Sequence, residues 1–192
     1  VNSALKSPNE FFMNGMFALP QEPTLDNFAI AWKKIRSYFG NSLIYVSISV
    51  PIIVLLSSMA AYALSRFEFR GKNVLVGLLM LGMLLPAHVT LLPNYMVLKS
   101  LNLLNSRVGL ILLYVALNIS FTFFLTRGHF LGISREIEEA AMVDGCPTWQ
   151  IFFRIILPMS LPVLIIALVM NYLNVWNDLV LSIIYVTKDE ML

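Results

Sequence analysis

Residues 136–162 read EIEEAAMVDGCPTWQIFFRIILPMSLP, a short polar segment in a chain that is otherwise mostly apolar. Its first residues are acidic, and the positive end of a helix dipole favours acids in a first helical turn. Gly145 can adopt the left-handed conformation that ends a helix, and Pro147 suits the first turn of the next helix. The segment therefore predicts a helix, a sharp turn and a second helix, placed between two apolar stretches.

The composition indicates that the chain lies in a lipid bilayer. Of its 192 residues, 58% are hydrophobic and 12% are charged, whereas soluble domains contain about 25% charged residues. The net charge of +2 is too small to indicate a nucleic acid partner. Cys146 is the single cysteine of the sequence, which excludes an internal disulfide and a multi-cysteine metal site. We expect no metal site of any other kind.

Four apolar stretches are long enough to cross a membrane, which takes about 20 apolar residues in a helix. Strands are not expected, because unpaired backbone groups are costly in lipid and no closed set of amphipathic strands is visible. We therefore expect an all-α integral membrane protein, a polytopic helical bundle. The four expected spans cover about 41–64, 73–98, 108–126 and 155–186, and Pro86, His88 and Pro93 interrupt the second.

The first 40 residues do not have the composition of a span. Thr24 can cap a helix that starts at Leu25. Apolar residues then recur at helical spacing with basic residues between them, as in an amphipathic helix at the membrane surface. Packing of this helix against its own protein is the alternative. We expect 1–40 to be an external segment and 41–192 to be the transmembrane domain. The apolar residues are Phe28, Ala31, Trp32, Ile35, Tyr38 and Phe39, and the basic ones are Lys33, Lys34 and Arg36.

The polar segment resembles the cytoplasmic EAA loop of the permeases of ABC importers. The pattern of that loop is Glu-Ala-Ala, three residues, a glycine, and a Leu-Pro pair further on. The resemblance implies that residues 133–158 form a coupling loop, whose helix docks in a cleft on a separate ATP-binding subunit. An amphipathic loop between two spans is the alternative. The residues in register are Glu139, Ala140, Ala141, Asp144, Gly145, Leu157 and Pro158.

Three further strings resemble carbohydrate permeases of the maltose type. They are SSMAAYALSRFEFRGK at 57–72, LLPAHVTLLPNYMVLKSLNLLNS at 84–106 and WND at 176–178. That family has one more span on each side of the four, and the chain lacks an initiator methionine, so we expect it to be part of a longer protein. A few positions depart from the family pattern and put details of the docking surface in doubt. They are Gly128-His129, Ile133-Ser134 and Cys146.

The resemblance implies a permease subunit that forms half of the transmembrane path for a sugar or oligosaccharide. A dimer of separate ATP-binding subunits would bind and hydrolyse the ATP, so the chain itself needs no cofactor. The other implied partners are a second permease, similar or identical, an extracytoplasmic solute-binding protein and membrane lipid. The implied location is the inner membrane of a bacterial-type cell, which the chain crosses several times.

Two alternative functions stay open at this point. A permease for an amino acid, peptide or polyamine would share the EAA loop, and only the strings SRFEFRGK at 65–72 and WND at 176–178 argue against it. A membrane protein with no transport role, such as an intramembrane enzyme, would need a catalytic set, and neither a Ser-His-Asp set nor paired catalytic carboxylates can be argued. Gly71 and Lys72 are followed by Asn73, not by the Ser or Thr of a phosphate-binding loop. We therefore expect no enzymatic activity.

The last expected span carries a polar stripe. Asn171, Asn174 and Asp178 stand at i, i+3 and i+7, on one side of a helix. A charge at mid-bilayer costs about 3 kcal/mol, so such residues usually face protein or water. The stripe could line a sugar path, and the alternative is hydrogen bonding between helices. The possible path residues are Asn171, Asn174, Trp176, Asn177 and Asp178, with Tyr172 as a second stacking surface and Asn118, Ser120 and Thr122 as a smaller patch.

The distribution of basic residues leaves the orientation undecided. If the loop at 66–72 is inside, six basic residues lie inside and seven lie outside. The dense cluster of three basic residues within 66–72 favours an inner position for this loop. The resemblance to an EAA loop implies the same orientation, because that loop must face the cytosol.

Overall fold

The computed structural model describes residues 2–14, 18–86 and 88–187, and all regular elements in these ranges are helices. The all-α expectation is therefore confirmed. The chain divides into two units, Val1–Asn41 and Ser42–Leu192. The elements are η1 (Asn2–Leu5), α1 (Pro8–Asn14), α2 (Asp26–Arg66), α3 (Lys72–Leu84), α4 (Leu91–Ser100), α5 (Arg107–Gly132), α6 (Arg135–Val143), α7 (Thr148–Ile151), η2 (Phe152–Ile156), α8 (Leu157–Met159), α9 (Leu161–Trp176) and α10 (Val180–Tyr185).

The first unit holds η1, α1 and the beginning of α2. The hydroxyl oxygen of Thr24 accepts a hydrogen bond from the backbone N–H of Asp26, the first residue of α2, over 3.1 Å. The side-chain amide of Asn27 donates to the carbonyl oxygens of Ala4 and Lys6 over 3.0 and 2.7 Å. Side chains at the start of α2 therefore fix the chain that precedes it, and Thr24 acts at the helix start as its sequence position predicts.

Helix α2 continues without a break through the region expected to separate a surface helix from the first span. It runs for 41 residues, so 25–38 and 41–64 lie almost wholly in one helix. The expected span starts at 41 because the apolar stretch without charged residues begins there, but such a change in polarity does not break a helix. Gly40 costs only about 1 kcal/mol in a helix interior, and no proline stands nearby.

The second expected span, 73–98, is two helices in the structure. Helix α3 ends at Leu84, and Leu85 is extended with φ −77° and ψ 120°. The cause is Pro86, because a residue before proline avoids the helical region. Pro93 falls in the first turn of α4, where a missing N–H does no harm. The proline positions thus account for the division of this span.

The expected span at 155–186 begins with a sharp bend. The helix Thr148–Met159 and α9 meet at 78°. Just before the bend, η2 is a π-helix, in which the N–H of Leu157 bonds to the carbonyl of Phe152. Pro158 explains the wider turn, because proline lacks an N–H for the fourth carbonyl before it and crowds that carbonyl. Pro162 then lies in the first turn of α9.

Length and composition of the described helices support fewer complete crossings than the four expected from sequence. Helices α2 and α5 are long and apolar enough to cross a membrane, and the bent pair Thr148–Met159 with Leu161–Trp176 makes a third if it crosses as one. Helix α3 is apolar but has only 13 residues. The difference arises because the second expected span is broken at Leu85.

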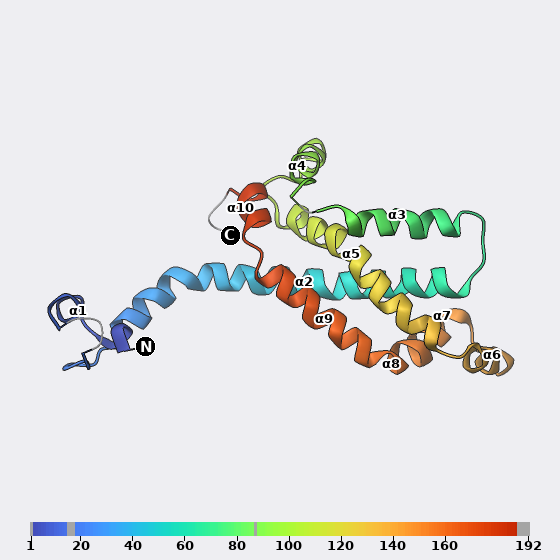
Figure 1. The fold of residues 1–192 in the computed structure, drawn as a ribbon, viewed down its shortest axis with the longest axis horizontal. Helices are drawn as coiled ribbons and strands as arrows, with labels where there is room; N and C mark the ends of the chain where they lie inside the picture. The colour runs from blue at the N-terminus through green and yellow to red at the C-terminus, as the bar shows by residue number, and fades with distance from the viewer. Residues whose placement is uncertain (1, 15–17, 87, 188–192) are drawn as a thin grey trace. The chain divides into compact units, whose positions relative to one another are not determined.

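Within the second unit, α5 packs against both α3 and α9 (Figure 1). One core cluster joins α2, α4, α5, α9 and α10, and includes Tyr45, Leu110, Tyr114 and Tyr185. A second cluster joins α2, α5, α6, α7 and η2, and includes Tyr62, Phe130, Ala141 and Phe152. Helix α5 contributes to both clusters and so connects the two ends of the unit.

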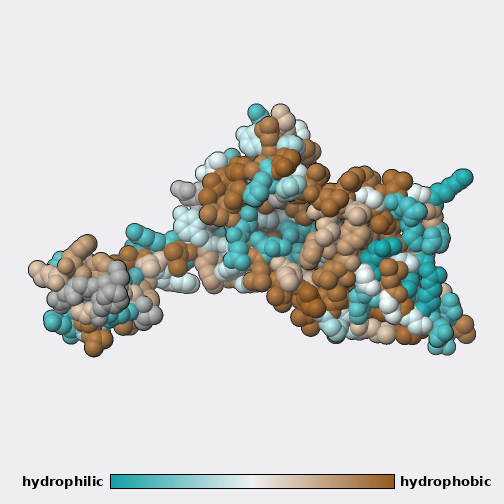
Figure 2. All heavy atoms as spheres, viewed as in Figure 1, coloured by the Kyte–Doolittle hydropathy of each residue, from teal (hydrophilic) through white to brown (hydrophobic). Residues whose placement is uncertain are grey.

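The surface of the second unit separates apolar from polar regions. Apolar atoms cover the visible sides of α3 and α9, whereas hydrophilic atoms gather where α6 and the loop between α2 and α3 lie (Figure 2). On α9 the exposed apolar side chains include Leu161, Ile165 and Val169. An apolar surface of this kind suits contact with lipid or with another apolar helix, and the polar end suits an aqueous compartment.

Candidate functional site

Helix α6 forms the first arm of the helix–turn–helix that the sequence predicts. Ser134 caps it, because its hydroxyl oxygen accepts a hydrogen bond from the N–H of Glu136 over 3.3 Å. Glu136 and Glu138 lie in the first turn, at the positive end of the helix dipole. The local sequence therefore accounts for the start of this helix.

The turn after α6 is a Schellman motif centred on Gly145. The N–H of Cys146 bonds to the carbonyl of Ala141 over 2.9 Å, and that of Gly145 bonds to the carbonyl of Met142 over 3.0 Å. Gly145 has φ +81°, so its predicted left-handed conformation is confirmed. Cys146 and Ala141 both contact the same core cluster, which is the apolar contact that usually accompanies this motif.

The two faces of α6 have different surroundings. Glu138 and Ala141, three residues apart, are only 4% and 7% exposed and face the protein. Glu139 and Ala140 are exposed, and Val143 at the end of the helix is 87% exposed. Of the two alanines in the expected coupling set, Ala141 therefore belongs to the core and only Ala140 is open to a partner.

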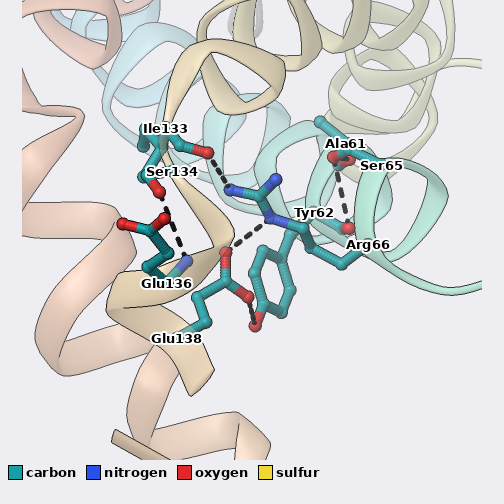
Figure 3. A network of polar contacts seen from close by, with 8 residues as sticks. All are labelled: Ala61, Tyr62, Ser65, Arg66, Ile133, Ser134, Glu136 and Glu138. Carbon is teal, nitrogen blue, oxygen red and sulfur yellow. Dashed lines mark hydrogen bonds and ion pairs between the residues drawn. The ribbon is translucent and has the colours of Figure 1, made fainter. Parts of the chain in front are cut away.

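Glu138 is held by two residues of α2 (Figure 3). Its Oε1 forms an ion pair with Nε of Arg66 at 2.5 Å, and its Oε2 accepts a hydrogen bond from the hydroxyl of Tyr62 over 2.9 Å. Nη2 of Arg66 also donates to the carbonyl of Ile133, just after α5, over 2.9 Å. We call Tyr62, Arg66 and Glu138 the α2–α6 joint.

Sequence reasoning missed the α2–α6 joint. Tyr62 and Arg66 are four residues apart and so share one face of α2, but Glu138 lies 72 positions further along the chain than Arg66. A weak signal was present, because Arg66 ends a long apolar stretch and Glu138 belongs to a cluster of acids. Neither fact identifies the partner of either charge.

Two hollows adjoin the joint. One, of about 190 Å³, is lined by charged residues of α2 and α6, among them Arg66, Glu138 and Glu139. The other, of about 500 Å³, is largely apolar and lies between the end of α2 and the helices α7 and η2, with Trp149 and Phe153 in its wall. The exposed side of the helix–turn–helix is therefore hollowed beside α6 as well as beside α7.

The loop between α2 and α3 carries one ion pair at this end of the unit. Nζ of Lys72 contacts Oε1 of Glu68 at 2.6 Å. The hydrogen bond from Lys72, and then its positive charge, lower the pKa of the Glu68 carboxyl. Glu68 is exposed, so this pair contributes little to stability.

The residues of the expected coupling set divide between two places, the region of α6 and the bend before α9. Asp144 and Gly145 are exposed at the turn, next to Glu139 and Ala140. Leu157 is partly buried and packs against two core clusters, and Pro158 lies at the bend before α9. Leu157 and Pro158 thus shape the bend, whereas the other members of the set lie on or near α6.

The polar stripe of the last span does not share one environment. Asn171 is fully buried and donates to Oγ1 of Thr122 over 2.8 Å and to the carbonyl of Ala167 over 2.7 Å. Asn174 is exposed and lies 3.4 Å from Oδ1 of Asn118 in a weak hydrogen bond. The smaller patch on α5 thus meets the stripe, and Asn171 connects the two helices.

Asp178 lies in the break between α9 and α10. Its carboxylate accepts hydrogen bonds from the N–H groups of Leu181 and Ser182 over 3.3 and 3.1 Å and so caps α10. It also accepts one from the hydroxyl of Tyr114 over 2.8 Å. Asn177 beside it is exposed. The hydrogen bonds of the Asp178 carboxylate therefore hold α10 on α5.

Trp176 and Tyr172 form an aromatic pair on α9. Their rings are stacked, with centroids 5.6 Å apart and planes 9° from parallel. Tyr172 is exposed and Trp176 is partly buried. Among the described residues, no group of three or more His, Cys, Asp and Glu could hold a metal ion.

The sequence has many relatives among proteins of known families. Residues 53–189 match the family described as binding-protein-dependent transport system inner membrane component. The chain is 41% identical over its whole length to the probable ABC transporter permease protein YurM of Bacillus subtilis, of which it covers 64%. It is 35% identical over 98% of its length to the diacetylchitobiose uptake system permease protein NgcG of Streptomyces coelicolor, of which it covers 63%.

A solved structure has the same fold. It is that of a bacterial ABC transporter involved in the import of the acidic polysaccharide alginate, and it matches 99% of this chain and 67% of that chain with a TM-score of 0.86 at 24% identity. The chain spans just under two thirds of the length of the two relatives named above. The match over 53–189, most of the second unit, shows that the chain belongs to the family of binding-protein-dependent transport system inner membrane components.

Proposed function

We propose that the chain is part of a permease subunit that carries a sugar or oligosaccharide through the inner membrane in a bacterial ABC importer. The observation that carries the proposal is α6 with its turn at Gly145, an exposed acidic helix at the polar end of an apolar bundle in a chain of this family. The similarity to NgcG, the permease protein of a diacetylchitobiose uptake system, supports a carbohydrate as the solute.

In this proposal the outer face of α6 docks on an ATP-binding subunit. Glu139 and Asp144 offer negative charge, and Ala140 allows close approach of the partner's backbone. Two ATP-binding subunits close on ATP, and their movement displaces the helix–turn–helix as a rigid body. A second permease, similar or identical, completes the path, and an extracytoplasmic solute-binding protein delivers the sugar.

The path itself is proposed to run past the exposed polar and aromatic residues at the end of α9. The amides of Asn174 and Asn177 supply both donors and acceptors, which can replace water around sugar hydroxyl groups. The stacked pair of Tyr172 and Trp176 offers a flat apolar surface for the faces of sugar rings. In this proposal Asn171 and Asp178 hold the lining helices in place, because their side chains are hydrogen-bonded within the protein.

Uptake of radiolabelled solutes by cells that lack the gene tests the proposal. The panel contains mono-, di- and oligosaccharides, amino acids and dipeptides, and the full-length gene is returned on a plasmid as the control. We expect uptake of one class of carbohydrate to be lost and then restored. Loss of amino acid or peptide uptake alone would replace the sugar by another solute, and unchanged uptake of every solute would contradict a transport role.

A further inference from the structure

We infer that the α2–α6 joint makes α2 follow the coupling helix, so that Tyr62, Arg66 and Glu138 are positioning residues for transport. The inference rests on the proposed function and adds the connection between the docking surface and the spans. Its basis is the burial and the geometry of the three side chains, which no local sequence pattern explains.

Both oxygens of the Glu138 carboxylate are held from α2. Arg66 contacts Oε1 and Tyr62 contacts Oε2, and these two residues are one helical turn apart on the same face. A carboxylate fixed at two points can neither rotate nor slide along α2. A contact between apolar surfaces, such as that of Ala141 with the core, allows sliding. The polar joint therefore transmits a displacement of α6 to α2 in every direction.

The joint is also tied to its surroundings. The ring of Tyr62 packs against Phe130 of α5 and Phe152 of η2, with centroids 6.4 and 5.1 Å away. Arg66 bonds to the carbonyl of Ile133 at the end of α5. A movement of α6 therefore reaches the ends of α2 and α5 together, and within the described part of the chain these are the two single helices long enough to cross the membrane.

Because the joint is buried, its stability requires both charges of the Arg66–Glu138 pair. The side chains of Arg66 and Glu138 are only 7% and 5% exposed, so loss of one partner leaves the other charge unpaired away from water. Glu139, the next residue, is exposed and has no place in the joint. Adjacent glutamates thus divide two tasks, with Glu138 directed to the spans and Glu139 directed to the ATP-binding subunit.

The test uses the complete importer, purified with its ATP-binding subunits and second permease and reconstituted in vesicles with the sugar that it carries. The measured quantities are sugar transported per ATP hydrolysed and the amount of ATP-binding subunit that copurifies. For Glu138→Gln we expect normal copurification but a fall in sugar per ATP of about three- to thirtyfold, as for a weakened coupling network. For Glu139→Gln we expect reduced copurification, because its contact is with the partner.

Two further variants complete the test. Glu68→Gln removes an exposed glutamate of the neighbouring loop and is expected to leave both quantities unchanged. Tyr62→Phe keeps the packed ring and removes only the hydroxyl. If Glu138→Gln fails to reach the membrane, the sugar transported per ATP by Tyr62→Phe is the deciding measurement. Wild-type sugar per ATP in Tyr62→Phe or in an assembled Glu138→Gln importer would overturn the joint. A wild-type complex that transports none of the mono-, di- and oligosaccharides of the uptake panel would instead contradict the proposed function.

Discussion

The side-chain amide of Asn171 donates a hydrogen bond to the hydroxyl of Thr122 over 2.8 Å, at a fully buried point between α9 and α5. This contact distinguishes Asn171 from Asn174 of the same polar stripe. A residue fixed between two helices holds them together, whereas Asn174 on the same helix is exposed.

Replacement of Asn171 should therefore affect stability. Asn171→Ala removes two hydrogen bonds and leaves a small void, and we expect it to cost about 0.5–2 kcal/mol. The measurement is the midpoint of thermal unfolding of the full-length protein in detergent micelles. Asn174→Ala is the matched control and should leave the midpoint unchanged. Equal midpoints for the two variants would contradict a structural role for Asn171.

Cysteine labelling should distinguish the same two positions by their access to water. In a Cys146→Ser background, Asn174→Cys is expected to react with a water-soluble thiol reagent, and transported sugar is expected to slow the reaction. Asn171→Cys should stay unlabelled, because its side chain is fully buried. Labelling at 171 but not at 174 would show that the path lies on the other side of α9.

Asp178 should tolerate an amide but not a methyl group. Asp178→Asn keeps an acceptor that can cap α10, and we expect only a small loss of thermal stability. Asp178→Ala removes the cap and the acceptor for Tyr114, and a lost cap alone costs about 1 kcal/mol. Asn177→Ala, at the exposed neighbour, is the control. If Asp178→Ala unfolds at the wild-type temperature, the carboxylate does not hold α10 in place.

Gly109 should be intolerant of any side chain. A Cβ atom there would overlap the carbonyl oxygen of Leu103, which belongs to the backbone and cannot move aside freely. Gly109→Ala should therefore displace the loop before α5 and lower the amount of protein in the membrane. Gly128→Ala, in the same helix but with open space around the new Cβ atom, should express normally. Normal expression of both variants would contradict the close approach.

Short-range features of the fold could be predicted from the sequence. Gly145 follows an amphipathic acidic stretch, and this pattern is enough to predict a left-handed helix end. Pro86 likewise marks the break after Leu84. The continuity of α2 through Gly40 was not predicted, because charge suggested a change of environment, and a change of environment does not by itself end a helix.

Long-range features of the site could not be predicted. Glu136, Glu138 and Glu139 look alike in the sequence, and only the packing of α6 shows that Glu138 faces inward. The pairing of Glu138 with Arg66 depends on how α2 and α6 meet in space. Burial along the polar stripe could not be predicted either, since Asn171 and Asn174 share a helix face but Asn171 is buried and Asn174 is exposed.

Site-directed cross-linking tests directly whether the exposed face of α6 contacts the ATP-binding subunit. The full-length protein with Val143→Cys in a Cys146→Ser background is treated, in membranes that contain the whole importer, with a reagent that joins thiols to amines. Val143 is chosen because it is 87% exposed at the end of α6. Leu101→Cys, exposed in the loop after α4 and expected on the other side of the membrane, is the control. We expect a covalent product with the ATP-binding subunit, identified by mass spectrometry, from Val143→Cys alone. No product from Val143→Cys, or an equal yield from Leu101→Cys, would contradict this contact.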